Sequence, residues 1–243
     1  MGERIVKVFD DRAPDQAADR LPLALAELHH HTDVGAPIRV RVGAASWAVT
    51  RLRFVIEGAG FAVDDIVDDG DATIAVDATR LRTLPDTVGP GMHVLLVGLN
   101  PSPFAADAGV GFARPGNRFW PAALASGLVT RSHDPFHALR VDGVGMTNLV
   151  RRATTRADEL ARTEYVQGTA RLERLVRWLE PKCVCFVGVT GYRVAIDKRA
   201  ALGWQPEPFA GAPTYVMPNT SGLNAHAKPA DFADHLRAVV AAA

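Results

Sequence analysis

The sequence predicts an α/β protein: a three-layer α/β/α domain with a central, mostly parallel sheet, preceded by a small N-terminal α+β unit. Two apolar runs, 94–99 and 183–189, are rich in branched residues and too short for helices, which is typical of strands buried on both faces. Helical patterns separate such runs after residue 91, and this alternation favours a parallel sheet covered by helices on both faces. The Pro/Gly-rich stretch 84–91 (LPDTVGPG) predicts a boundary between an accessory unit, 1–90, and a second domain, 91–243.

The first unit mixes helical and strand patterns. Its predicted elements are a short helix over 15–31 interrupted at Pro22, a strand over 37–42, a helix over 45–61 stopped by Gly58 and Gly60, and one half of a hairpin over 68–79 with Asp-Gly in the turn. Residues 1–90 carry 10 Lys and Arg against 15 Asp and Glu, a net charge of −5. This acidic balance is hidden in the overall charge of zero.

The second domain alternates strands and helices. The predicted order is a strand over 94–99, a long loop, a helix over 117–128, a strand over 143–150, an amphipathic helix over 158–181, a strand over 183–189, a strand over 213–223 broken at Pro218, and a closing helix over 230–243. Residues 91–243 carry 17 basic against 12 acidic residues, a net charge of +5. This moderate excess suits a polyanionic partner but is also common in proteins that bind none.

The composition suits a sizeable apolar core without a membrane segment. Almost half (48%) of the 243 residues are apolar, and no run is long enough to span a bilayer. The charged N-terminus (MGERIVKVFDD) lacks the apolar core of a signal peptide. Cys183 and Cys185 are predicted to point to opposite faces of one strand, which disfavours a disulfide, and two thiols are too few for an iron–sulfur cluster. We therefore expect a reduced, cytoplasmic protein.

Three predicted strands end in loops that carry an asparagine: GLNPS, GMTNLVRR and MPNTSGLNAH. The carboxyl ends of parallel strands meet at one edge of the sheet, so Asn100, Asn148 and Asn219 are candidates for one pocket. Amides are neither strong bases nor nucleophiles, which argues against acyl transfer. Ser221 lacks the Gly-x-Ser-x-Gly elbow of a hydrolase triad, and the glycines of GVGFARPG have the wrong spacing for a dinucleotide loop.

Amides can serve a cleavage whose leaving group is already good, because such a reaction needs only a positioned water and hydrogen bonds to the departing anion. Hydrolysis of a base–sugar bond fits this description. An enzyme that does so on duplex DNA must also extract the base and hold it against an aromatic ring. GFARPGNRFW supplies Phe112 for stacking, and Leu223 is a candidate apolar plug.

The motifs GLNPS, GFARPGNRFW, GMTNLV and MPNTSGL together resemble the mismatch-specific uracil/thymine DNA glycosylases (MUG/TDG) of the uracil-DNA glycosylase superfamily. The resemblance covers about residues 92–240, with four motifs in the family's order, and leaves residues 1–90 outside. It implies that Asn100 positions the attacking water, Phe112 stacks on the flipped base and Asn148 lies in the base pocket.

The resemblance also implies roles for neighbouring residues. Those expected to line the base pocket are Gly98, Leu99, Pro101 and Ser102, and those expected to contact DNA are Asn219, Ser221, Gly222 and Leu223, with Leu223 as the wedge. Arg151 and Arg152 are further candidates for phosphate contacts. The sequence departs from the family at Ser102, where glycine is commoner and where the serine would crowd the pocket. Ala225 stands where the bacterial branch has an arginine.

Each of these residues also has a simpler interpretation. Asn100 would be a turn residue, Phe112 and Leu223 ordinary core, and Asn148 a capping or buried amide. Arg151 and Arg152 would be solvated surface arginines. The run His29-His30-His31 would bind a metal only if three consecutive side chains converged, which is rare in a native fold.

The sequence thus predicts a monofunctional DNA glycosylase of base excision repair that hydrolyses the N-glycosidic bond of uracil, with thymine and other damaged bases left open. The alternatives are a non-catalytic lesion-binding module and a small-molecule N-glycoside hydrolase. We expect no metal or organic cofactor, a monomer, a cytoplasmic, nucleoid-associated location, and double-stranded DNA with a G·U or related mismatch as partner. Residues 1–90 are expected to dock a protein partner or to shield the basic face.

Overall fold

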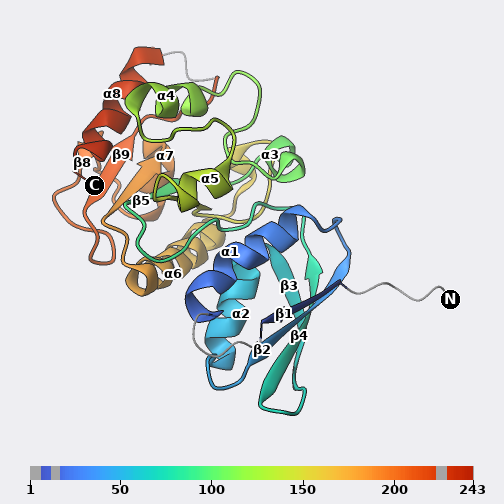
Figure 1. The fold of residues 1–243 in the computed structure, drawn as a ribbon. Coiled ribbons are helices and arrows are strands. Elements are labelled where there is room, and N and C mark those ends of the chain that lie inside the picture. The colour runs from blue at the N-terminus through green and yellow to red at the C-terminus, as the bar shows by residue number, and fades with distance from the viewer. Residues whose placement is uncertain (1–6, 12–16, 223–228, 243) are drawn as a thin grey trace. The chain divides into compact units, whose positions relative to one another are not determined.

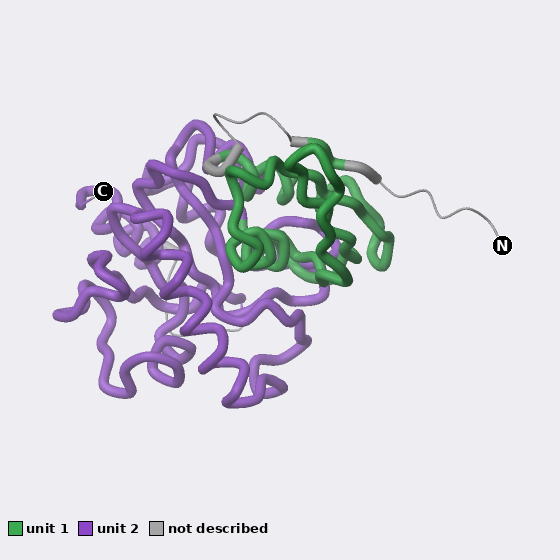
Figure 2. The backbone as a smooth tube through the Cα atoms, turned by 90° about the horizontal axis from the view of Figure 1, so that it is seen from below, with its two compact units in different colours: residues 1–86 green, residues 87–243 purple. Residues whose placement is uncertain are grey.

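The computed structural model describes residues 7–11, 17–222 and 229–242 of the chain. The chain consists of two compact units, with the boundary between Asp86 and Thr87, and Figure 2 colours them separately. The division falls within the Pro/Gly-rich stretch 84–91. No helix among the described residues is both long and apolar enough to cross a membrane.

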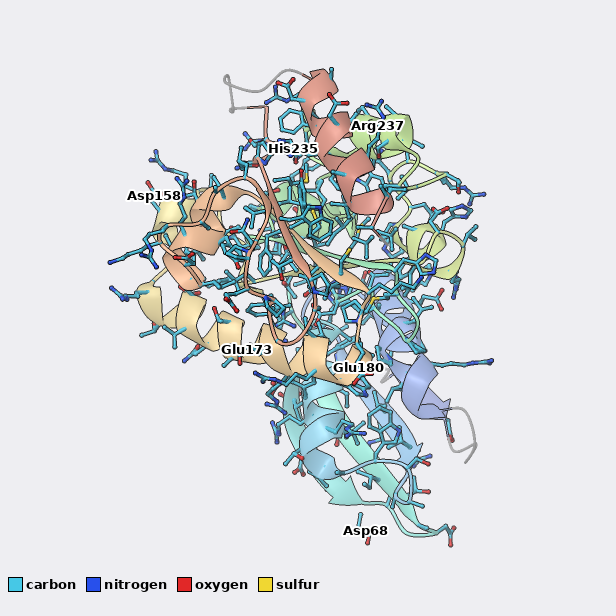
Figure 3. The ribbon with its side chains drawn as sticks, turned by 90° about the vertical axis from the view of Figure 1, so that its left-hand side faces the viewer. Asp68, Asp158, Glu173, Glu180, His235 and Arg237 are labelled. Carbon is cyan, nitrogen blue, oxygen red and sulfur yellow. The ribbon has the colours of Figure 1, made fainter. Side chains whose placement is uncertain are left out.

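The first unit is a four-stranded mixed sheet with two helices. Its elements are β1 (Lys7–Asp11), α1 (Ala17–His30), β2 (Pro37–Gly43), α2 (Val49–Gly58), β3 (Phe61–Asp68) and β4 (Thr73–Arg80), and the strand order is β1-β2-β4-β3. β1 and β2 are parallel, whereas β4 runs antiparallel to both β2 and β3. Asp68 lies near the tip of the β3–β4 hairpin (Figure 3), where an Asp-Gly turn was expected.

The core of this unit follows from the period of two along β2. Ile38, Val40 and Val42 are buried on one face, while the side chains between them are half-exposed. On the half-exposed face, Arg39 makes a bidentate ion pair with Asp77 of β4, at 2.7 and 2.6 Å. This pair lowers the pKa of Asp77, because hydrogen bonds from the guanidinium favour the carboxylate form.

The predicted interruption at Pro22 is wrong. Pro22 lies inside α1, which continues to His30. Proline removes one hydrogen bond of the helix ladder and disfavours the preceding turn. Leu21 and Leu25 are completely buried, and the burial of such side chains contributes about 1.5–3 kcal/mol each, which offsets the disruption.

The second unit contains a five-stranded sheet of order β6-β5-β7-β9-β8. Its strands are β5 (Val94–Gly98), β6 (Val144–Asn148), β7 (Cys183–Val187), β8 (Gly203–Trp204) and β9 (Thr214–Met217). All neighbours in the sheet are parallel except β8 and β9, which are antiparallel. The mostly parallel sheet predicted from the sequence is confirmed.

Helices cover both faces of this sheet (Figure 1). They are α3 (Pro103–Ala108), α4 (Phe119–Ser126), α5 (Pro135–Arg140), α6 (Arg162–Leu179), α7 (Val189–Ala195) and α8 (Pro229–Val240), with a 3₁₀ turn at Ala157–Glu159. On one face, residues of α4, α5 and α8 share one apolar cluster with the strands. On the other face, Tyr192 of α7 packs edge-to-face on Phe186 at a centroid distance of 4.8 Å. The short elements α3, α5, α7 and β8 were not predicted.

The expected orientation of the two cysteines is also wrong. Cys183 and Cys185 are both buried in the same apolar cluster, because residues two apart on a strand point to the same face. Both thiols are free. Burial raises the pKa of Cys183 to about 11, so this thiol is neutral at pH 7.

Candidate active site

The parallel strands bring several predicted site residues to one edge of the sheet. Gly98 at the end of β5 is paired in register with Asn148 at the end of β6. The Leu149 and Val150 amides that follow β6 donate to the carbonyls of Gly98 and Leu99, each at 2.8 Å. The loops after β5 and β6 are therefore fixed to each other by backbone hydrogen bonds at the carboxyl ends of the strands, where open α/β sheets place their ligand crevice.

Three of the candidate pocket residues converge at Gly98. A Cβ atom added to Gly98 would lie 2.6 Å from Oδ1 of Asn148 and 3.5 Å from Cζ of Phe112. A side chain at position 98 would therefore push the Asn148 amide aside. Phe112 has a left-handed φ of 58°, and its ring stacks on Phe119 at a centroid distance of 4.3 Å. Such a conformation is uncommon for a bulky residue and indicates that packing holds the ring in place.

The backbone of Asn148 is held by a side chain of helix α6. One terminal nitrogen of Arg171 on α6 donates to the carbonyl oxygen of Asn148 at 2.5 Å and to Oγ1 of Thr147 at 3.0 Å. Gly168, one helical turn before Arg171, allows the close approach, since a Cβ atom there would lie 2.2 Å from the carbonyl oxygen of Leu149. These contacts fix the backbone that carries the Asn148 amide.

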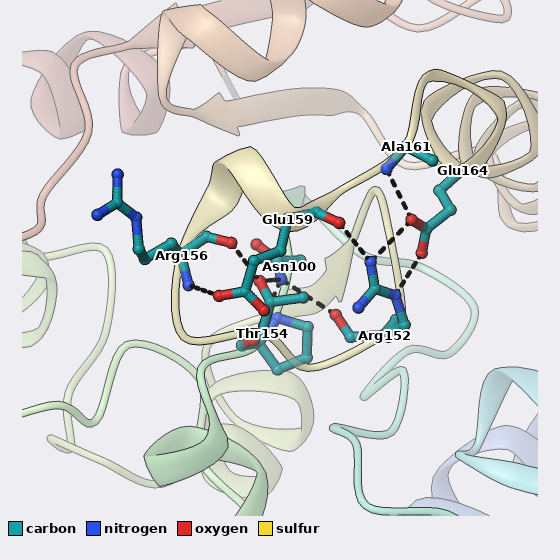
Figure 4. Close-up of polar contacts among 8 residues, drawn as sticks. Asn100, Arg152, Thr154, Arg156, Glu159, Ala161 and Glu164 are labelled. Carbon is teal, nitrogen blue, oxygen red and sulfur yellow. Dashed lines mark hydrogen bonds and ion pairs between the residues drawn. The ribbon is translucent and has the colours of Figure 1, made fainter.

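The Asn100 side chain has a defined orientation. Its Nδ2 atom donates to Oγ1 of Thr154 at 2.7 Å and to the carbonyl oxygen of Arg152 at 3.0 Å, and lies 3.3 Å from the carbonyl oxygen of Pro101 (Figure 4). Only an NH₂ group satisfies the carbonyl acceptors, so the amide oxygen points away from them. Among the described residues, none donates a hydrogen bond to Oδ1 of Asn100. This oxygen is therefore available as an acceptor.

Thr154 reinforces this orientation. Its hydroxyl donates to the carbonyl oxygen of Arg156 at 2.8 Å, so the oxygen itself must accept from Asn100. The backbone amide of Thr154 donates to the carbonyl of Pro101 at 3.0 Å. Thr154 is buried, with 6% of its surface exposed, which protects these bonds from competition with water.

An ion-pair network closes the loop that carries Thr154 (Figure 4). The Arg152 guanidinium donates to both carboxylate oxygens of Glu164, at 2.7 and 2.9 Å, and to the carbonyl of Glu159 at 2.7 Å. Glu164 also accepts from the amide of Ala161 at 2.8 Å. Together the hydrogen bonds from Arg152 and Ala161 lower the pKa of Glu164 to about 2.

The structure places the two arginines predicted to contact phosphates differently. The side chain of Arg152 is exposed, but its guanidinium is already paired with Glu164. Arg151 is half-buried. The charge that Arg152 offers to a phosphate is therefore partly neutralised. Its carbonyl oxygen accepts a hydrogen bond from Nδ2 of Asn100.

Ser102, where the sequence departs from the family pattern, caps the helix that follows it. Its Oγ accepts from the amide of Ala105 at 3.2 Å, so it is the N-cap of α3. Leu99 packs against α7, where a Cβ atom on Gly191 would lie 3.0 Å from Cδ1 of Leu99. Pro101 is buried. These neighbours of Asn100 thus build the strand end and its flanking helices.

The loop after β9 forms a separate turn. Oδ1 of Asn219 accepts from the amide of Ser221 at 2.9 Å, and Asn219 lies against Gly188 at the end of β7. Asn219 and Gly222 are exposed and Ser221 is half-exposed. Leu223 and Ala225 lie outside the described residues. Asn219 thus lies at the same edge of the sheet as Asn100 and Asn148, and β7 separates its strand, β9, from β5.

The described residues contain no group of three or more His, Cys, Asp or Glu side chains that could hold a metal ion. Of the histidine run, His29 is completely buried, with its ring edge-to-face on Phe61 of the first unit. Burial and the nearby charge of Arg80 lower the pKa of His29 to about 4. His29 is therefore a neutral core residue of that unit.

Thr154 and Arg171 were not predicted as site residues. Thr154 is 54 positions from Asn100, and the pattern ATTRADEL carries no feature that separates Thr154 from Thr155. Arg171 looked like part of the polar face of a helix. A threonine two residues after an arginine pair in a strand-end loop is too weak a signal to identify the contact of Thr154 with Asn100.

A family model described as "Uracil DNA glycosylase superfamily" matches residues 85–241 of the chain. The match covers the whole sheet of the second unit and the loops that carry Asn100, Phe112, Asn148 and Asn219. The first unit lies almost entirely outside it.

Proposed function

Because the chain belongs to the uracil DNA glycosylase superfamily, a family of DNA-repair hydrolases, we propose that it is a monofunctional glycosylase of the mismatch-specific uracil/thymine branch. It would release uracil from G·U pairs in duplex DNA, in base excision repair, and act as a monomer. The observation that carries the proposal is the fixed Asn100 amide, whose Oδ1 is left to accept a hydrogen bond from water.

In the proposed reaction the target base is rotated out of the duplex and stacks on Phe112, next to Gly98. Asn148, held by Arg171, hydrogen-bonds the base. The glycosidic bond breaks, its electron pair leaves with the base as an anion, and the sugar becomes cation-like. A water held by Asn100 then bonds to C1′ and loses its proton to the solvent.

Asn100 cannot accept the proton of the water as a carboxylate would, so we expect modest turnover. The described site contains no alternative base among the atoms that contact Asn100, which are two carbonyl oxygens and a neutral hydroxyl. Catalysis then depends on positioning and on a good leaving group. This limits the proposed substrates to bases that leave readily as anions, such as uracil.

The proposal is tested by base release from labelled duplexes that contain U·G, U·A or T·G, followed by alkaline strand cleavage. Wild type should release uracil from U·G, and Asn100→Ala should lose release while binding persists. Gln167→Ala is the matched control, because Gln167 is an exposed amide on α6. If wild type binds every lesion duplex and releases no base, the protein is a lesion-binding module instead.

A further inference from the structure

Arg118 connects two parts of the second unit that are far apart in the sequence. Its backbone amide donates to the carbonyl oxygen of Thr220 at 3.0 Å, and a terminal nitrogen of its guanidinium donates to the carbonyl of Ser221 at 2.8 Å. Both acceptors belong to the loop that follows β9. One residue thus binds two successive carbonyls across 103 positions of sequence.

The guanidinium itself is anchored. It lies over the ring of Phe232 on α8, with 4.8 Å between Cζ of Arg118 and the ring centroid. Phe232 is completely buried in the apolar cluster, so the ring is a rigid support. A cation over an aromatic face is stabilised by the ring quadrupole, and the planar guanidinium can donate at its edge at the same time.

The backbone around Arg118 packs closely against the same loop. A Cβ atom added to Gly222 would lie 2.9 Å from the carbonyl oxygen of Gly116. Thr220 is completely buried. The loop 219–222 is therefore seated on the segment 116–118, and its exposed end at Gly222 is held against that segment.

The segment that contains Arg118 also carries the aromatic side of the base pocket. Phe119 follows Arg118 directly, and its amide donates to Oδ1 of Asn117 at 2.9 Å. The Phe119 ring stacks on Phe112, whose ring approaches Gly98. Arg118 thus joins the two parts: its backbone is adjacent to the aromatic side of the pocket, and its guanidinium donates to the loop.

We propose that Arg118 is a positioning residue that holds loop 219–222 in register with the Phe112 pocket, so that extraction of a base and insertion into the gap occur together. The inference rests on the proposed function and on the expectation from the sequence that this loop contacts the DNA where the base is extracted. Arg118 does not touch the reacting atoms. Its role is specific to duplex substrates, because single-stranded DNA has no gap to fill and no pair to break.

The test compares Arg118→Met with wild type on duplex U·G and on single-stranded uracil DNA, in single-turnover assays. Methionine keeps an unbranched stem but removes the donors. We expect the ratio of duplex to single-strand rates to fall by about 10- to 100-fold, the range that corresponds to hydrogen bonds from a charged donor. Single-strand rates should stay within about twofold, since the contacts of Asn100 are untouched. Arg177→Met, which removes an exposed charge at the far end of α6, should leave the ratio unchanged.

Hydrogen exchange of the backbone provides an arm that does not need activity. In Arg118→Met the segment 219–222 should exchange faster, while the strands β5 and β6 stay protected. Arg118→Lys, which keeps a cation over Phe232, is measured in the same way if the methionine variant does not fold. A parallel fall of both rates, or exchange equal to that of wild type, overturns the positioning role. If segment 219–222 exchanges faster in Arg118→Met but wild type releases no base, the proposed function is refuted and the contact of Arg118 with the loop still stands.

Discussion

The contact between Thr154 and Asn100 gives a direct test of how the site works. Replacing Thr154 with valine keeps the shape of the side chain and removes the hydroxyl. Two hydrogen bonds are lost: the one from Nδ2 of Asn100 at 2.7 Å and the one to the carbonyl of Arg156 at 2.8 Å. One N–H of the Asn100 amide then has no side-chain acceptor, and the amide can rotate away from the orientation that exposes Oδ1.

The size of the effect follows from the hydrogen-bond energies. A buried donor that loses its partner costs about 1–3 kcal/mol, and a typical bond contributes about 1 kcal/mol net. If about 1–2 kcal/mol of this is lost from the transition state, the rate of base release falls by roughly 5- to 30-fold. The same loss in the folded state lowers Tm by about 2–4 °C for each kcal/mol.

The assay is single-turnover release of uracil from a U·G duplex with enzyme in excess, which separates the chemical step from product release. Thr154→Ser keeps the hydroxyl and should stay close to wild type. Thr155→Val is the matched control, because Thr155 is the exposed neighbour of Thr154. A folded Thr154→Val variant whose rate is within twofold of wild type would refute the argument that Thr154 orients Asn100.

Three further predictions follow from close packing and from one buried histidine. Gly98→Ala places a Cβ atom 2.6 Å from Oδ1 of Asn148, the flexible end of a side chain, so Tm should change little while kcat/KM on U·G falls at least about tenfold. Gly168→Ala places a Cβ atom 2.2 Å from the backbone carbonyl of Leu149, which cannot give way cheaply, so urea unfolding should show a loss of about 1–3 kcal/mol. The pKa of His29 is lowered from 6.5 to about 4 in the folded state, so the unfolded state binds the proton more tightly. The free energy of unfolding of the first unit should therefore fall by about 1.4 kcal/mol for each pH unit as pH drops from 6.5 to 4, and urea titrations of His29→Gln should lack this dependence.

Much of the fold is encoded in local patterns. The apolar runs at β5 and β7 predicted buried parallel strands, and the periodicity of residues 158–181 predicted the amphipathic helix α6. These patterns work because burial acts on each segment separately. Short elements such as α3 and β8 contain too few residues to show a periodicity. The predicted interruption at Pro22 was wrong because the packing of neighbouring leucines outweighs the low helix propensity of proline.

The candidate site shows the same division. The position of Asn100, Asn148 and Asn219 after apolar strands was visible in the sequence, because strand ends and prolines are local features. The sequence alone also determined which residue types are available, and these argue against a serine triad and a dinucleotide loop.

Only the tertiary structure decided how these residues are held. Thr154 lies 54 positions from Asn100, and Arg118 lies 103 positions from the carbonyl it binds. The register between β5 and β6, and not any local preference, sets Gly98 beside Asn148, so that a side chain at position 98 would displace the Asn148 amide. Such contacts arise where separate loops meet at one edge of a sheet, and their geometry depends on packing that no single segment specifies.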